Sequence, residues 1–142
     1  MGVILDTSVL IAAERQSSRF ESLLERLGDE PVAISSITAS ELLHGCYRAA
    51  DAGIRARRSA FVEALIGLIP VLPFGLAEAR RHAELWWELA RIGGTVGPYD
   101  LVTGATAVAR GYMLATLNKR EFARIPGLKL FDLDAFIGNR PS

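Results

Sequence analysis

The chain is short of the features that mark secreted or membrane proteins. It has a single cysteine, Cys46, so no disulfide can form within the chain and a reducing compartment fits. The first residues lack a basic segment, and Asp6 interrupts the apolar run that a signal peptide would need. The longest nearly apolar run starts at Ala64, is broken by Pro70 and Pro73, and falls short of the ~20 residues of a membrane span. These absences predict a soluble, cytoplasmic protein with no membrane partner.

The chain also lacks a charge excess, because 16 basic residues balance 16 acidic ones. Bulk charge therefore neither indicates nor excludes a nucleic-acid partner, and such binding would need a local basic patch. Half of the 142 residues are hydrophobic, which argues against disorder and supplies a substantial core. We expect a single domain over residues 1–142, with a flexible tail from about residue 136.

Short apolar runs alternate with helical patterns along the chain. The runs predicted to be strands are residues 3–5, 32–34, 71–72, 112–115 and 128–131. The segments predicted to be helical are residues 8–14, 18–27, 38–50, 54–68, 76–92 and 98–111. Strands that alternate with helices imply parallel βαβ units. The predicted fold is a three-layer α/β/α domain with a central, mostly parallel sheet of four to five strands.

Asp6 interrupts the most hydrophobic stretch of the N-terminus and directly follows the first predicted strand. In an open parallel sheet, ligands bind just beyond the carboxyl ends of the strands, so Asp6 is placed for chemistry. The competing interpretation is a helix N-cap, because Asp, Thr and Ser all cap well. For Asp6 taken alone, capping is the commoner role.

Three further polar residues, Glu41, Asp100 and Asn118, open helices or follow strands, and each has a structural alternative. Glu41 lies three residues after Thr38, which is the spacing of a capping box. Asp100 falls in a first helical turn, where a carboxylate gains ~0.3–1 kcal/mol from the helix dipole. Asn118 could simply close a turn.

Taken together, the four residues share one place in the predicted fold, the carboxyl edge of the sheet. Carboxylates that converge without a cation raise each other's pKa, and a hard divalent metal removes that penalty. Mg²⁺ takes oxygen ligands, whereas zinc is disfavoured because no His or Cys stands at zinc spacing. We therefore predict that Asp6 reaches a metal at the end of its strand, while Thr7 and Ser8 begin the helix and hold the carboxylate in place.

Three segments of the sequence carry a family resemblance. LDTSVLI, ITASELLHG and PYDLVTGATAVARGYMLATLNKREFARIPGLKL resemble those of a PIN domain, and more closely of a VapC-type toxin from a bacterial toxin–antitoxin (VapBC) system. Order and spacing match as well as the motifs, over residues 3 to about 131. The resemblance implies a metal-dependent endoribonuclease that forms homodimers and is silenced by a small VapB-type antitoxin.

The resemblance also assigns the site. The family's three acidic positions fall on Asp6, Glu41 and Asp100, its fourth position, often Asp, falls on Asn118, and its hydroxyl residue falls on Thr116. A neutral Asn carries one charge fewer, which favours one strong metal site over two.

The expected reaction is hydrolysis of an RNA phosphodiester by water, with Mg²⁺ as cofactor and Mn²⁺ able to substitute. Asp6 and Asp100 are the first choices for direct ligands, and Glu41 would ligate through water or accept the proton of the attacking water. Asn118 would orient water or metal. The residues expected to contact RNA are Lys119 and Arg120, which follow Asn118, and Arg15 near the end of the first helix.

Other features of the sequence are more simply explained by structural roles. The cluster of arginines at positions 55–58 is more typical of a solvated helix face. Trp86 and Trp87 could stack on bases, but core or interface packing is the commoner role, and at most one of two adjacent helical residues is expected to be buried. His44 and His82 are read as ordinary surface or half-buried side chains. The RNA target is left open.

Two other functions compete with a nuclease. A strand-ending Asp before Thr can be a phosphotransfer nucleophile, although Ser8 stands where a second Asp is usual and Lys119 is a poor partner lysine. A PIN-like module that binds RNA or protein without cutting has Asn118 as its sequence support. A dinucleotide-binding fold is disfavoured because DTSV, and no G-x-G-x-x-G, follows the first strand.

Overall fold

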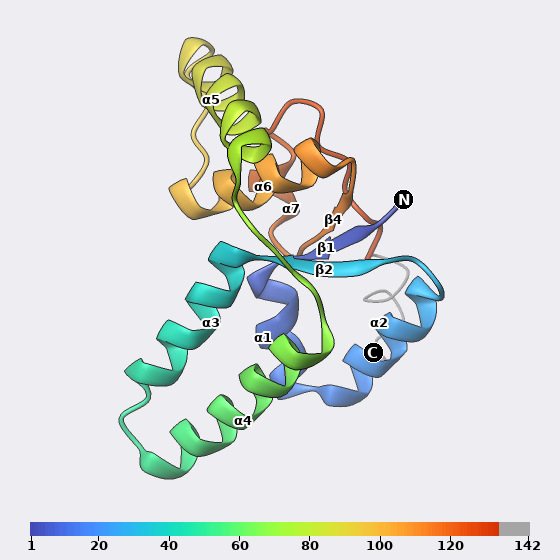
Figure 1. The fold of residues 1–142 in the computed structure, drawn as a ribbon, viewed down its shortest axis with the longest axis vertical. Helices are drawn as coiled ribbons and strands as arrows, with labels where there is room; N and C mark the ends of the chain where they lie inside the picture. The colour runs from blue at the N-terminus through green and yellow to red at the C-terminus, as the bar shows by residue number, and fades with distance from the viewer. Residues whose placement is uncertain (134–142) are drawn as a thin grey trace.

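Four parallel strands form the centre of the molecule. The computed structural model describes residues 1–133, apart from the side chains of residues 17 and 19, so the predicted tail lies outside the described residues. In this part of the chain the sheet has the order β3-β2-β1-β4 (Figure 1). The strands are β1 (Val3–Leu5), β2 (Val32–Ser35), β3 (Val71–Leu72) and β4 (Met113–Ala115).

Helices cover both faces of the sheet. They are α1 (Thr7–Arg15), α2 (Ser17–Leu27), α3 (Ser36–Arg48), α4 (Ala52–Leu68), α5 (Leu76–Arg91), α6 (Pro98–Arg110) and the short α7 (Lys119–Phe122). Figure 1 shows α1 to α4 on one side of the sheet and α5 to α7 on the other. The predicted three-layer α/β/α architecture is confirmed, with element ends that differ by one or two residues.

Alternation along β1 divides the core in two. Val3 and Leu5 point into a cluster built with α1 to α4, whereas Ile4 points into a second cluster that includes Leu114 and Phe122. Successive side chains of a strand face opposite sides of a sheet, so a run buried throughout requires cover on both sides. The unbroken apolar pattern at residues 3–5 follows from this burial.

The edges of the sheet are short. β3 lies at one edge, as the prolines on either side of it predict. At the other edge, the predicted strand at 128–131 is reduced to a single parallel bridge between Leu130 and Leu114. Two hydrogen bonds hold this segment, from Leu114 N to Lys129 O at 2.9 Å and from Phe131 N to Leu114 O at 2.7 Å.

Two arginines tie the antiparallel pair α3 and α4 together. Arg55 donates from Nε and Nη2 to Ala49 O, at 3.0 and 2.7 Å, and so satisfies a carbonyl at the end of α3. Arg58 donates to Glu14 Oε1 at 3.3 Å and to Gly45 O at 3.2 Å. These side chains therefore join helices instead of forming only a solvated face.

No helix within residues 1–133 has the length and apolar character needed to cross a membrane.

Candidate active site

The site begins where β1 and β4 end side by side. Asp6 follows β1 and its amide donates to Ala115 O at 2.9 Å, which joins the ends of the two strands. Parallel neighbours in a sheet bring their carboxyl ends to one edge. Asp6 and Thr116, which come directly after the two strands, are therefore neighbours in space.

Asp6 is a buried carboxylate held by two hydroxyl groups. Its side chain is 5% exposed, and its Oδ2 accepts hydrogen bonds from Ser8 Oγ and Thr116 Oγ1, both at 2.8 Å. Asp6 occupies the N-cap position of α1, but its side chain makes no capping hydrogen bond. The hydroxyls fix the carboxylate at the sheet edge, which is the supporting role predicted for Ser8 and expected of Thr116 from the family pattern.

Glu41 points to the same edge from α3. Thr7 Oγ1 donates to Glu41 Oε1 at 2.9 Å, so the residue after Asp6 holds the second carboxylate. The capping box is wrong: α3 begins at Ser36, and Ser35 is its cap, accepting from Thr38 N at 3.2 Å. Burial raises the pKa of Glu41, and the charge of Asp6 raises it further, against the lowering effect of the Thr7 hydrogen bond.

Buried hydroxyls connect the elements that carry these acids. Ser35 Oγ lies 3.0 Å from Thr103 Oγ1 of α6 and donates to Thr38 Oγ1 at 3.1 Å. Thr7 Oγ1 lies 3.3 Å from Thr38 Oγ1. In the part of the chain that the structure describes, no buried side-chain nitrogen or oxygen lacks a hydrogen-bond partner. The satisfied network fixes α1, α3 and α6 relative to one another.

Asp100 shows most clearly that the acids converge. It lies in the first turn of α6, two residues after Pro98. Burial, followed by the charges of Asp6, Glu121 and Glu41, raises its pKa from 3.8 to about 7, and its protonated form shares a hydrogen bond with Glu121. Burial is the largest cause of this shift, and the contributions of the charges of Asp6 and Glu41 indicate that these two acids lie near Asp100.

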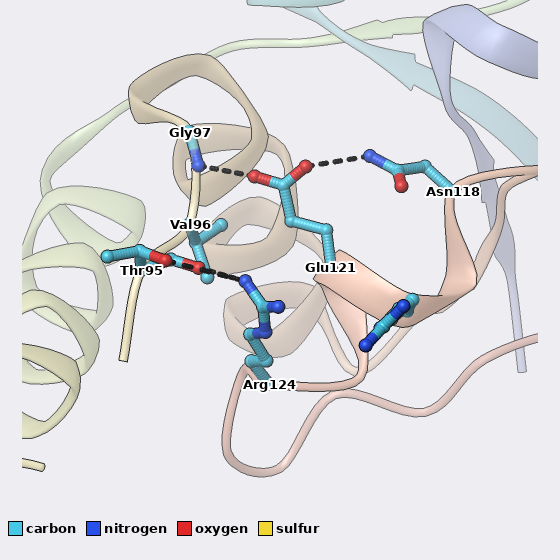
Figure 2. Close-up of a pocket in the computed structure, with 7 residues that line it drawn as sticks. Thr95, Val96, Gly97, Asn118, Glu121 and Arg124 are labelled. Carbon is cyan, nitrogen blue, oxygen red and sulfur yellow. Dashed lines mark hydrogen bonds between the residues drawn. The ribbon is translucent and has the colours of Figure 1, made fainter. Parts of the chain in front are cut away.

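Asn118 and Glu121 complete this edge, and Glu121 is a residue that the sequence reasoning missed. Asn118 Nδ2 donates to Glu121 Oε2 at 2.8 Å, and Gly97 N donates to Glu121 Oε1 at 2.6 Å (Figure 2). The Gly97 amide is the main reason that the pKa of Glu121 is lowered. The i, i+3 spacing from Asn118 was an available signal, but the contact with Gly97 joins distant parts of the chain.

Basic residues border the acidic cluster on two sides. A hollow of about 530 Å³ is lined by Gly97, Asn118, Glu121, Arg120 and Arg124, among others (Figure 2).

A second hollow, of about 260 Å³, lies between α1, α3 and α4 and is lined by Thr7, Glu41 and Arg15, among others. Arg120 and Arg15 each line a hollow that also contains predicted site residues. Lys119, which precedes Arg120 in the chain, is the first residue of α7.

The donor chemistry of the cluster fits a hard divalent cation. All the side chains that converge offer carboxylate, amide or hydroxyl oxygen, and Mg²⁺ is usually held by one or two carboxylates with water completing the shell. The raised pKa of Asp100 marks a repulsion that a cation would relieve. Within residues 1–133, no group of three His, Cys, Asp or Glu side chains is arranged closely enough to hold a metal ion as it stands.

The fold is an open parallel α/β domain with acidic side chains at the carboxyl edge of its sheet. The sequence matches the PIN domain family over residues 3–128. Ribonuclease VapC1 of Rickettsia felis is 36% identical over 135 residues, covering 95% of this chain and 98% of the relative. The tRNA(fMet)-specific endonuclease VapC of Salmonella typhimurium is 36% identical, covering 91% and 96%.

Solved structures show the same relationship. VapBC2 from Rickettsia felis, bound to a DNA fragment from its promoter, has a TM-score of 0.85 at 27% identity, covering 92% of this chain and 98% of that one. DNA-bound VapBC from Salmonella typhimurium has a TM-score of 0.84 at 32% identity, covering 93% and 98%. The chain belongs to the PIN-domain family and, within it, to the VapC-type ribonucleases. Nucleases of this type are generally metal-dependent.

Proposed function

We propose that this chain is the toxin of a type II toxin–antitoxin pair and hydrolyses RNA phosphodiester bonds with Mg²⁺, for which Mn²⁺ can substitute. The observation that carries the proposal is the meeting of acids at one sheet edge, where Asp6 accepts from Thr116 Oγ1 at 2.8 Å and Glu41 accepts from Thr7, the neighbour of Asp6, at 2.9 Å. Asp100 lies in the first turn of α6, and burial, with the charges of Asp6, Glu121 and Glu41, raises its pKa to about 7. Unrelieved, these charges would also repel the phosphate of a substrate. At ~4 Å and an effective dielectric of 20, two like charges repel by ~4 kcal/mol.

Each residue of the edge takes a distinct role in the proposal. Asp6 and Asp100 hold the cation, and Asp6 is kept in position by the hydroxyls of Ser8 and Thr116. Glu41, with its raised pKa, is suited to accept a proton from the attacking water or to ligate through water. When bound, the divalent cation supplies Lewis-acid chemistry that neutralises and polarises the phosphate.

Asn118 acts together with Glu121 in the proposed mechanism. Its amide group holds the Glu121 carboxylate, and its own oxygen is left to orient water at the edge of the cluster. Direct attack by water breaks the bond from phosphorus to the 3′ oxygen, so the products carry a 5′-phosphate and a 3′-hydroxyl. A 2′,3′-cyclic phosphate would require attack by the ribose 2′-hydroxyl and would contradict this mechanism.

The partners follow from the relatives. VapBC complexes from Rickettsia felis and Salmonella typhimurium are among the similar structures, and we propose a small VapB-type antitoxin and a homodimer for this chain as well. Two relatives, from Salmonella typhimurium and Shigella flexneri, are tRNA(fMet)-specific endonucleases, which makes tRNA(fMet) the first RNA to test. The proposed place of action is the cytoplasm.

The deciding experiment is RNA cleavage by the purified chain with Mg²⁺, with Mn²⁺ and with EDTA. We expect cutting with either metal, none in EDTA, and losses of more than about 100-fold for Asp6→Asn and Asp100→Asn, beyond what outer partners of metal ligands cost. Asp29→Asn is a matched control, since Asp29 is exposed and away from the sheet edge. Sequencing of 5′ ends after brief induction in cells would then identify the target.

The alternative is a catalytically weak PIN-like module that binds RNA or protein. If wild type and both variants cut RNA equally poorly with either metal, that function replaces the nuclease. Trapping of an acyl phosphate on Asp6 would instead support phosphotransfer.

A further inference from the structure

A third hollow lies beside the acidic cluster, between α5 and the segment that leads into α6. Its volume is about 360 Å³, and the residues that line it include His82, Trp86, Leu89, Val96, Pro98 and Leu101. None of its lining residues is an Asp, Glu, Lys or Arg, and burial lowers the pKa of His82, which keeps the imidazole neutral at pH 7. A hollow of this size that is mostly apolar and aromatic, and has no charged side chain, suits a flat organic ring better than a phosphate.

His82 and Trp86 of α5 form one wall of this hollow, and Phe74, which precedes α5, packs against His82 from outside the lining. The ring centroids of Phe74 and His82 are 5.6 Å apart in an edge-on arrangement, and those of His82 and Trp86 are 5.8 Å apart. Trp86 is 63% exposed, so the series ends in a ring that is open to solvent. Trp87 is 64% exposed as well, so the expectation that at most one tryptophan is buried is confirmed, and neither ring packs in the core.

Trp86 and Trp87 differ in their surroundings. Trp86 borders the hollow, whereas Trp87 is not among its lining residues and has the guanidinium carbon of Arg91 over its ring, 5.0 Å from the centroid. The two residues have the same chemistry and almost the same exposure, yet only one of them faces the cavity.

The aromatic hollow adjoins the larger hollow at the edge of the acidic cluster. Thr95 and Val96 line both this hollow and the larger one that contains Gly97, Asn118 and Glu121.

Two contacts fix the shared wall. Arg124 Nη1 donates to Thr95 O at 2.8 Å, and Glu121 accepts from Gly97 N at 2.6 Å (Figure 2). The arginines of the larger hollow, the shared wall and the aromatic hollow therefore lie next to one another in that order.

We infer that Trp86 and His82 form a subsite for one unstacked RNA base that neighbours the bond being cut. Single-stranded RNA is recognised by stacking splayed bases on aromatic side chains, while phosphates take arginine contacts. The order of the two hollows matches this division, with Arg120 and Arg124 for the backbone and Trp86 for the base. The inference rests on the proposed function, because an RNA strand in the acidic cluster is what directs the base to this place.

The test compares two short stem-loop RNAs that differ at one position. One carries all its bases, and in the other a loop nucleotide next to the mapped cleavage site is replaced by an abasic ribose. Cleavage by enzyme in excess is measured for wild type, Trp86→Ala, Trp86→Phe and the matched control Trp87→Ala. Affinity for both RNAs is measured by fluorescence anisotropy in an Asp6→Asn background, and the mass of each variant is determined in solution.

We expect Trp86→Ala to lower kcat/KM on the complete RNA about 10-fold, within the range that one base stacked on one aromatic ring supplies. The same variant should act on the abasic RNA as wild type does, Trp86→Phe should recover most of the loss, and Trp87→Ala should match wild type.

Equal losses on both RNAs, with a dimer converted to monomer, would show that α5 docks a second copy of the chain and would overturn the subsite. No effect of Trp86→Ala on either RNA would overturn it too. Failure of wild type to cut with any metal would reject the nuclease, and the anisotropy comparison would still decide whether Trp86 holds the base.

Discussion

The acidic cluster should cost the metal-free protein stability, and Asp100→Asn should recover it. The pKa of Asp100 is raised from 3.8 to about 7, so the folded state binds the proton more tightly than the unfolded state does. Stability from this group is therefore complete below about pH 4 and is lost as the pH rises to about 7. Above that pH the wild type carries the full penalty, and the neutral variant escapes it.

The expected stabilisation by Asp100→Asn follows from the size of the shift in the pKa of Asp100. About three pKa units at 1.36 kcal/mol each set a ceiling of about 4 kcal/mol. Because Asp100 is only half-buried and water screens its charge, we expect about 1–2 kcal/mol. For a chain of this length, that corresponds to a rise in Tm of about 2–8 °C.

The assay is thermal unfolding of wild type and Asp100→Asn in EDTA, at about pH 8 and at about pH 5. At about pH 5, less than half of the variant's extra stability at pH 8 should remain. With Mg²⁺ present, the wild type should have a higher Tm than Asp100→Asn. A ligand at 100 times its Kd stabilises the protein that binds it by about 2.7 kcal/mol, and the variant should bind Mg²⁺ poorly. Asp29→Asn should behave as wild type throughout. A variant that is no more stable than wild type in EDTA at pH 8 would refute the reasoning, because the acids would then not repel one another.

Three further predictions concern single contacts. Thr116→Val removes a hydroxyl from Asp6 and should lower RNA cleavage about 10–100-fold, as the loss of an outer partner of a metal ligand does, while Thr116→Ser restores it. Ser35→Ala deletes the cap of α3 and should lower the free energy of unfolding by about 1 kcal/mol in a denaturant titration. Gly104→Ala should destabilise by roughly 1–3 kcal/mol, because its Cβ would lie 2.5 Å from a buried isoleucine, whereas Gly45→Ala, with open space, should stabilise by about 0.5–1 kcal/mol.

The strands and the layering were predictable because each follows from local pattern. Residues 3–5 are apolar without alternation, which indicates a strand covered on both faces, and the alternation of strands with helices fixes parallel connections. The position of Asp6 after such a strand then places it at the sheet edge. Its role in catalysis stays a prediction, as do those of Glu41, Asp100 and Asn118.

What the sequence left undecided depends on contacts between distant segments. Thr38 and Glu41 have the spacing of a capping box, but β2 runs on to Ser35, which caps α3 instead and leaves Glu41 to Thr7. Glu121 owes its place to the amide of Gly97 in a segment far from it in the chain. No local pattern encodes either contact.

The order of the chain has a consequence for the cell that makes it. Asp6 and Glu41 are synthesised early, but the hydroxyl of Thr116 and the carboxylate of Glu121 come from the last part of the described chain. A growing polypeptide on the ribosome, surrounded by RNA, therefore cannot assemble the cluster until β4 has paired with β1.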